Sequence, residues 1–497
     1  MTESILEKKA KILIPTHLTI EDVIAVSDNW TKVAISKIGE ERIISARKRL
    51  TEFLNTGKVI YGVNTGFGAL VDKSISKEAY NKLQMNLIRS HALGAGSFLP
   101  KEVVRAAMFL RANMLAKGYS GVRLELVQLL VEMLNRNVVP VVYEKGSVGA
   151  SGDLAPLAFV ALVLIGRGKA FYQDRIVNGK SALQKAGLSP LTLQAKEGLS
   201  LINGTEMMAG LGVFNLKEAS FLADLADIAG ALSFVALGGN LQALDKRLAQ
   251  LKPYPGQKIT TQNLNRLLKS INNSSSVIQN AYSLRCLPQV HGAVRETQRF
   301  VRSIVETEIN SVTDNPIILD NGIIAGGNFH GATIAIAMDN LAITSCILGG
   351  IAERRIARLM DPKLSNLAPF LTPKPGINSG LMMTQILATT LQTENKILST
   401  PASIHSLPTS ANQEDFVSMG MDSALKARKV IENTKTILAL ELICACQAIE
   451  LAKVRLNKNL NRYFEFIRRV VPFQKNDQEL TQPLKRLLQN IEAILKV

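Results

Sequence analysis

The sequence has little cysteine: its 497 residues include only Cys286, Cys346, Cys444 and Cys446. Their spacing matches no zinc-binding pattern, and four thiols in a chain of this length do not make a disulfide framework. This scarcity argues against a zinc protein and against a secreted, disulfide-stabilised fold. Because a reducing compartment fits best, we expect the protein to be cytoplasmic.

Patterns typical of targeting or membrane-spanning segments are also lacking. The first eleven residues carry Glu3, Glu7 and three lysines rather than an apolar run, so we do not expect secretion. Of the two most apolar windows, 154–166 is too short to span a bilayer and 437–449 contains Glu441. We expect both windows to be buried core helices, and we expect no membrane partner.

Acidic residues are the scarcer charge, because 58 Lys and Arg stand against 41 Asp and Glu and give a net charge of +17. Such an excess can indicate nucleic-acid binding. Here the basic residues are spread along the chain, and the densest patches, 47–49 and 453–462, lack the interleaved aromatic residues of a base-stacking surface. We therefore predict a solvated basic face that attracts anionic substrates, and no nucleic-acid partner.

Apolar residues recur at helical spacing along most of the chain. Long helices are predicted at about 207–237, 295–312, 333–358, 380–397 and 423–456, whereas strand-like pieces such as 138–143 are short. The expected fold is mainly α, with a helical-bundle domain at 199–497. A smaller mixed N-terminal domain is expected at 1–198.

The N-terminal domain contains the most informative motif, Gly-Ser-Val-Gly-Ala-Ser-Gly-Asp-Leu-Ala-Pro-Leu-Ala at residues 146–158. Because Gly152 has no Cβ, its backbone nitrogen can approach the carbonyl carbon of Ala150 with little steric penalty. If this ring closes with loss of water, and Ser151 also loses water, the product is a 4-methylidene-imidazol-5-one (MIO). The alternative is an ordinary Gly/Ser loop ahead of a helix.

Six further sequence motifs accompany this one. They lie at 61–68 (Tyr-Gly-Val-Asn-Thr-Gly-Phe-Gly), 83–91, 201–205, 279–286, 326–331 and 408–420. Together they span most of the chain in a fixed order. On these motifs the sequence resembles the aromatic amino acid ammonia-lyase family, and above all its histidine-type members. The resemblance implies that MIO forms autocatalytically from Ala150, Ser151 and Gly152 and that no external cofactor is needed.

The resemblance assigns roles to four polar residues. Tyr61 would act as the base that removes the β-proton of the substrate, although a phenol needs activation by neighbours to do so at neutral pH. Arg285 would bind the substrate carboxylate, which its planar guanidinium suits; its alternative role is a structural ion pair. His91 would contact the substrate ring, and Asn203 would hydrogen-bond the electrophile or the substrate.

Four further residues match family positions. Gln279 and Tyr282 would orient or polarise the reacting groups, with Tyr282 counted as catalytic. Phe329 would lie beside the electrophile, and Glu414 would pair with an imidazole or transfer a proton. No metal is expected, because His330 has no second His or carboxylate nearby in the sequence.

The same motifs bear on the substrate. Ser90, His91 and Glu414 are the histidine-type choices, which implies elimination of ammonia from L-histidine to give trans-urocanate, the first step of histidine degradation. Asn280, where the family more often has Asp, and Phe416, where histidine-type members commonly have His, depart from the pattern. They keep open a tyrosine or phenylalanine ammonia-lyase, or a 2,3-aminomutase.

The resemblance also implies a homotetramer with a central helical bundle, in which each active site draws on loops of more than one subunit. A catalytically silent structural or nucleic-acid-binding homologue is the alternative from another class. Only the net charge of +17 suggests it.

Overall fold

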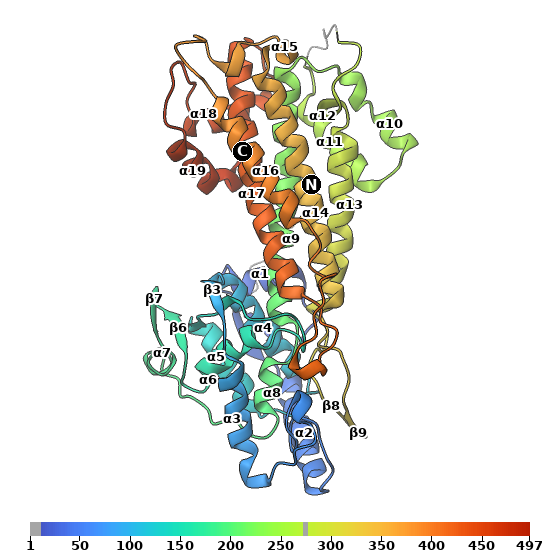
Figure 1. Ribbon diagram of the computed structural model, residues 1–497, viewed down its shortest axis with the longest axis vertical. Helices are drawn as coiled ribbons and strands as arrows, with labels where there is room; N and C mark the ends of the chain where they lie inside the picture. The colour runs from blue at the N-terminus through green and yellow to red at the C-terminus, as the bar shows by residue number, and fades with distance from the viewer. Residues whose placement is uncertain (1–10, 272–276) are drawn as a thin grey trace. The chain divides into compact units, whose positions relative to one another are not determined.

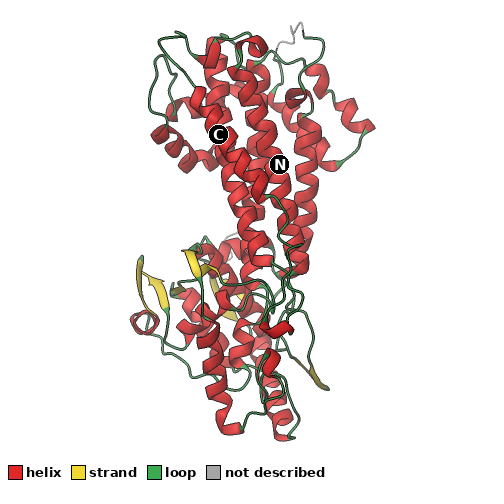
Figure 2. Ribbon diagram, in the orientation of Figure 1, coloured by secondary structure: helices red, strands yellow, loops and turns green. Residues whose placement is uncertain are grey.

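The computed structural model describes residues 11–271 and 277–497, and helices dominate this part of the chain (Figure 2). The mainly α fold expected from the sequence is confirmed. By their internal contacts the residues form two compact units. Unit 1 comprises the described part of Met1–Phe214 with Ser303–Met338 and Pro401–Leu425, and unit 2 comprises the described part of Asn215–Arg302 with Asp339–Thr400 and Lys426–Val497. The domain boundary expected at 198/199 stays a prediction, since these units are defined by contacts and not by independent folding.

Unit 1 combines helices of up to 19 residues with short strands (Figure 1). Its helices are α1 (Ile20–Ser27), α2 (Lys37–Asn55), α3 (Tyr80–His91), α4 (Lys101–Ala116), α5 (Leu124–Asn135), α6 (Ala155–Leu164), α7 (Gly179–Lys185) and α8 (Glu197–Ile202). Its strands are β1 (Lys11–Ile14), β2 (Lys32–Ile35), β3 (Ala95–Phe98), β4 (Val139–Pro140), β5 (Tyr143–Lys145), β6 (Lys169–Tyr172), β7 (Arg175–Asn178), β8 (Ile317–Leu319) and β9 (Gly322–Ile324). β1 and β2 pair in parallel, and the pairs β3–β5, β4–β6, β6–β7 and β8–β9 are antiparallel.

The core of unit 1 is built around α4, which packs against α1 and α5. Arg105 of α4 is buried, and its guanidinium donates hydrogen bonds to the carbonyls of Val26, Ser27 and Leu134. These carbonyls lie in the last turns of α1 and α5, where intrahelical partners are missing. Burial lowers the pKa of Arg105 to about 10, so the side chain stays charged at neutral pH. Arg105 thereby caps the C-terminal ends of α1 and α5 inside an apolar core.

Unit 2 is almost entirely helical. Its own helices are α10 (Lys246–Leu251), α11 (Pro255–Leu267), α12 (Tyr282–Arg285), α15 (Pro362–Ser365), α16 (Met382–Leu398), α18 (Lys458–Val470) and α19 (Thr481–Asn490). Four long helices contribute residues to both units: α9 (Glu206–Ala236), α13 (Leu287–Glu308), α14 (Ala332–Met360) and α17 (Gly420–Leu451).

Within unit 2 a buried ion pair joins the long helices. Arg355 of α14 contacts Glu441 of α17 at 2.6 Å, and both side chains are fully buried. Ser233 of α9 donates a hydrogen bond to the same carboxylate at 2.7 Å. Since a buried charge is tolerated when it is paired and hydrogen-bonded, Glu441 is compatible with the otherwise apolar window 437–449. That window is a buried part of α17, as expected from the sequence.

Two helices of the described chain, α9 and α14, are long and apolar enough to cross a membrane by length and composition alone. Of their most apolar windows, 83% and 61% respectively is buried inside the protein. A buried core helix passes the same test, so this finding is weak evidence for a membrane span.

Candidate functional site

A cavity of about 460 Å³ in unit 1 gathers motif residues that are far apart in the sequence. Its polar lining comes from Tyr61, Asn86, Ser90, His91, Ser151, Asn203, Ser410 and Glu414. The remaining lining is largely apolar and includes Phe67, Leu83, Leu87, Leu154, Leu199 and Ile202. A cavity of this volume that combines an apolar lining with convergent polar groups is typical of a small-molecule site.

The backbone around Ser151 has a conformation that requires glycine. Gly152 has φ +75°, and a Cβ at this position would lie 2.1 Å from the carbonyl oxygen of Gly204. The next two amides, of Asp153 and Leu154, donate hydrogen bonds to the carbonyls of Gly204 and Ile202 at 2.6 and 3.2 Å. The segment after Ser151 is therefore pressed against the start of α9, and no larger residue fits at Gly152.

Asp153 ties this loop to α9. Its carboxylate is fully buried and accepts hydrogen bonds from the backbone amides of Met207 and Met208 at 2.5 and 3.2 Å. Burial raises the pKa of Asp153 well above its ordinary value, and the two amides act in the opposite direction. Because both oxygens are engaged in the first turn of α9, this carboxylate anchors the loop.

Asn203 holds the carbonyl of Ser151. Its Nδ2 donates a hydrogen bond to that oxygen at 3.1 Å, and its Oδ1 is buried without a hydrogen-bond partner among the described residues. Arg111 in turn donates to the backbone carbonyl of Asn203 at 3.0 Å and pairs with Glu206 at 2.7 Å. A buried acceptor without a partner is uncommon, so Oδ1 of Asn203 is a polar position beside Ser151 that the described residues leave unsatisfied.

Glu414 contacts the side chain of Ser151. The Ser151 hydroxyl donates a hydrogen bond to Glu414 Oε1 at 3.0 Å. The hydroxyls of Thr409 and Ser410 donate to Oε2 at 2.9 and 2.7 Å. The carboxylate is thus held by three hydroxyls with one oxygen directed at Ser151.

His91 ends α3 with a defined ring orientation. Its Nδ1 lies 2.9 Å from the carbonyl oxygen of Leu87 and 3.0 Å from the Ser90 hydroxyl. A carbonyl oxygen can only accept, so the neutral ring carries its proton on Nδ1 and its Nε2 is an acceptor. His91 therefore offers the cavity a single acceptor nitrogen.

Tyr61 belongs to a glycine-rich loop that is fixed from two sides. The amide of Gly68 donates to the Tyr61 hydroxyl oxygen at 3.1 Å. The side chain of Gln84 on α3 donates to the carbonyl of Gly62 at 3.1 Å and accepts from the amide of Leu199 at 3.0 Å. The loop that carries Tyr61 is thus joined to α3 and α8.

The structure brings Tyr61, His91, Ser151, Asn203 and Glu414 to one cavity, but six other predicted residues do not line it. Two of these, Ala150 and Gly152, flank Ser151 in its loop. Phe329 belongs to unit 1 and is half-buried. Gln279, Tyr282 and Arg285 belong to unit 2, where Tyr282 is 75% exposed. The roles of all eleven residues stay predictions.

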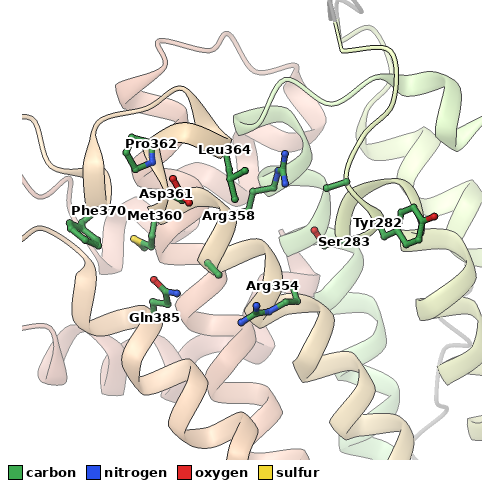
Figure 3. Close-up of a pocket in the computed structure, with 12 residues that line it drawn as sticks. Tyr282, Ser283, Arg354, Arg358, Met360, Asp361, Pro362, Leu364, Phe370 and Gln385 are labelled. Carbon is green, nitrogen blue, oxygen red and sulfur yellow. The ribbon is translucent and has the colours of Figure 1, made fainter.

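Tyr282 lines a different cavity of unit 2, of about 720 Å³ (Figure 3). Figure 3 shows Tyr282 and Ser283 on one side of it, with Arg354 and Arg358 projecting from α14. Within the described residues no group of His, Cys, Asp and Glu side chains is placed to hold a metal ion. This larger cavity contains none of the unit 1 motif residues, and so the smaller cavity is the stronger candidate.

The two departures from the family pattern have structural settings outside the unit 1 cavity. The side chain of Asn280 accepts from the amide of Asn240 at 3.0 Å and donates to its carbonyl at 2.9 Å. Only an amide can make both bonds, which a carboxylate could not. Phe416 stacks on His330 with ring centroids 6.2 Å apart and is 67% exposed.

Arg111, Asp153, Thr409 and Ser410 were not predicted from the sequence, although they hold the polar groups and the backbone around Ser151. Asp153 directly follows the triplet, and Thr409 and Ser410 lie inside the 408–420 string, so their positions were a usable signal. Arg111 had no such signal, since nothing in the spacing of α4 distinguishes it from Arg105 of the same helix.

Comparison with known proteins adds an independent finding. Residues 18–469 match the model of the family described as aromatic amino acid lyase. The chain is 47% identical over 479 residues to the histidine ammonia-lyase of Caldanaerobacter subterraneus subsp. tengcongensis, which covers 95% of this chain and 94% of that protein. Among solved structures, it is similar to histidine ammonia-lyase from Trypanosoma cruzi, with a TM-score of 0.90, 38% identity, and coverage of 98% and 94% of the two chains. It is also similar to Pantoea agglomerans phenylalanine aminomutase, with a TM-score of 0.92, 32% identity, and coverage of 97% and 98%.

Proposed function

This chain belongs to the aromatic amino acid lyase family, and from that premise we propose that it eliminates ammonia from L-histidine to give trans-urocanate. The observation that carries the proposal is the presence of His91 and Glu414 in the same cavity as Ser151. The high identity to a histidine ammonia-lyase supports the same substrate. The reaction would be the first step of histidine degradation.

The family uses an MIO group, and we assign its formation here to Ala150, Ser151 and Gly152. The residues present fit this group: Gly152 lacks the Cβ that would meet Gly204, and Asn203 donates to the Ser151 carbonyl. When formed, MIO supplies an electrophile that makes the substrate nitrogen a better leaving group. No external cofactor is required by this assignment.

The chain's own residues supply orientation and proton transfer. In the proposed reaction Tyr61 takes a proton from Cβ of the substrate, the Cα–N bond breaks and ammonia leaves. The acceptor Nε2 of His91 receives the N–H of the substrate imidazole, which fixes the ring at one end of the cavity. Asn203 Oδ1, buried and without a partner among the described residues, accepts from the substrate ammonium.

We propose that the protein assembles as a homotetramer and that a second copy completes each site. The cavity in unit 1 is not lined by Gln279, Tyr282 or Arg285 of the same chain. The proposed chemistry nevertheless needs a cation to bind the substrate carboxylate. In the assembly Arg285 of the partner subunit would supply it. We also propose a cytoplasmic location and no nucleic-acid partner, which an absence of salt-dependent gel shifts with DNA and RNA would support.

The proposed function is tested by offering L-histidine, L-tyrosine and L-phenylalanine to the purified protein. We expect the ultraviolet absorbance of trans-urocanate to rise with release of an equal amount of ammonia. The resemblance to phenylalanine aminomutase makes a β-amino acid the alternative product. Formation of such a product without ammonia would contradict the lyase assignment.

Arg285→Lys is expected to lower kcat/KM for L-histidine by about 10- to 100-fold, because lysine keeps the charge but loses the two parallel hydrogen bonds of the guanidinium. Inhibition by urocanate should weaken in parallel, since it also carries a carboxylate. Arg299→Lys, an exposed change on α13 of the same unit, serves as the matched control and should alter neither value. Unchanged urocanate affinity in Arg285→Lys would reassign Arg285 to a structural ion pair.

A further inference from the structure

We propose that Glu414 has a second function: it catalyses the loss of water from Ser151 that completes the electrophile. The inference rests on the proposed formation of MIO from residues 150–152 and concerns how that group is made. The observation behind it is the hydrogen bond from the Ser151 hydroxyl to Glu414 Oε1 at 3.0 Å. This hydroxyl is the group that must leave.

The chemistry divides into two dehydrations. In the first, the nitrogen of Gly152 bonds to the carbonyl carbon of Ala150, and that carbonyl oxygen leaves as water with the amide protons of Ser151 and Gly152. In the second, Ser151 loses its Cα proton and its Cβ hydroxyl, and a Cα=Cβ double bond forms. Each step releases one water and needs no oxidant.

Glu414 is placed for the second step. As a carboxylate it accepts the Cα proton of Ser151, and as the resulting acid it gives a proton to the leaving hydroxyl, so it ends in its starting state. Cα and the hydroxyl oxygen are joined through a single carbon, so one carboxyl group can serve both. Asn203 assists as a positioning residue, because its Nδ2 donates to the Ser151 carbonyl, where charge develops as the Cα proton leaves.

The alternatives in the described part of the site are engaged elsewhere. Asp153 is closest in sequence, but its oxygens accept from the amides of Met207 and Met208. No acidic side chain other than Glu414 hydrogen-bonds to the Ser151 hydroxyl among the residues described. The hydroxyls of Thr409 and Ser410 donate to Glu414 Oε2, so that Oε1 is the oxygen that contacts Ser151.

The test follows intact mass in full-length protein synthesised without cells and sampled over time. The mass of the wild-type protein should fall below its sequence mass by about 36 Da, which corresponds to two waters. Glu414→Gln should instead accumulate a species whose mass is about 18 Da below the sequence mass, which corresponds to one water. The rate of conversion from one deficit to two should fall at least about 100-fold, the usual size of acid–base catalysis. Glu414→Asp, which keeps a carboxyl group, should restore part of this rate.

Asp415→Asn is the matched control, because Asp415 is the exposed carboxylate next in sequence, and it should mature like wild type. Circular dichroism shows whether each variant is folded. If Glu414→Gln does not fold, the maturation rate of Glu414→Asp is compared with that of wild type instead. Wild-type maturation rates in Glu414→Gln would overturn the proposal while leaving the lyase function intact. A folded Glu414→Gln chain of full sequence mass would also overturn it, since Glu414 would then act before ring closure. Failure of wild type itself to lose water would instead overturn the MIO assignment.

Discussion

Ser151→Ala is expected to abolish nearly all turnover of L-histidine while the protein stays folded. Alanine has no hydroxyl to lose, so the electrophile cannot form, and loss of a covalent catalytic group costs at least about three orders of magnitude in rate. The fold should survive because Ser151 is only half-buried and its side chain makes a single hydrogen bond among the described residues, to Glu414. Turnover, thermal unfolding and intact mass measure the three consequences.

Mass gives the sharpest readout of this change. Wild type should weigh less than its sequence by two waters, or about 36 Da, whereas Ser151→Ala should lose at most the single water of ring closure, about 18 Da. Ser45→Ala, which removes an exposed hydroxyl from α2, should keep both the deficit and the activity. Active wild-type protein of full sequence mass would refute a backbone-derived electrophile.

The need for glycine in the Ser151 loop was readable from the sequence because it depends on neighbouring residues. Gly152 has φ +75° and contacts Gly204, whereas the predicted approach of its nitrogen to the Ala150 carbonyl stays a prediction. Helix positions were readable for a similar reason, since apolar spacing is a local signal: the segments 207–237 and 333–358 correspond to α9 and α14. Boundaries were less accurate. α13 begins at Leu287, eight residues before the predicted start at 295, because Pro288 is tolerated in a first helical turn.

Contacts between distant segments could not be read in this way. The role of Arg111 depends on the turn that brings Asn203 beside α4, and the setting of Asn280 depends on the backbone of Asn240. Neither pair has a signature in spacing, since each is a consequence of packing. The placement of Arg285 in unit 2 is of the same kind, and it is the reason that the proposed site includes a second copy of the chain.

The preference for the substrate side chain follows from the polar groups of the cavity. His91 presents one acceptor nitrogen and Glu414 a carboxylate, and an imidazole can pair with such groups where a phenyl ring cannot. Leaving a buried polar group without a partner costs about 1–3 kcal/mol, which is about 5- to 150-fold in kcat/KM for each group. Wild type is therefore expected to favour L-histidine over L-phenylalanine by two or more orders of magnitude, as measured by kcat/KM for both substrates.

The double substitution Ser90→Phe with His91→Leu should erode this preference while leaving Glu414, and with it maturation, in place. Leucine removes the acceptor nitrogen, and phenylalanine removes the hydroxyl 3.0 Å from His91 Nδ1. We expect kcat/KM for L-histidine to fall about 5- to 150-fold, the cost of one lost polar pairing, and kcat/KM for L-phenylalanine to stay or rise. Lys82→Ala, an exposed change on the same helix α3, should alter neither value. Intact mass shows whether the double variant carries the electrophile, so a change in preference reports on the cavity alone.

Wild type that used L-tyrosine or L-phenylalanine faster than L-histidine would refute the histidine assignment and leave the lyase mechanism standing.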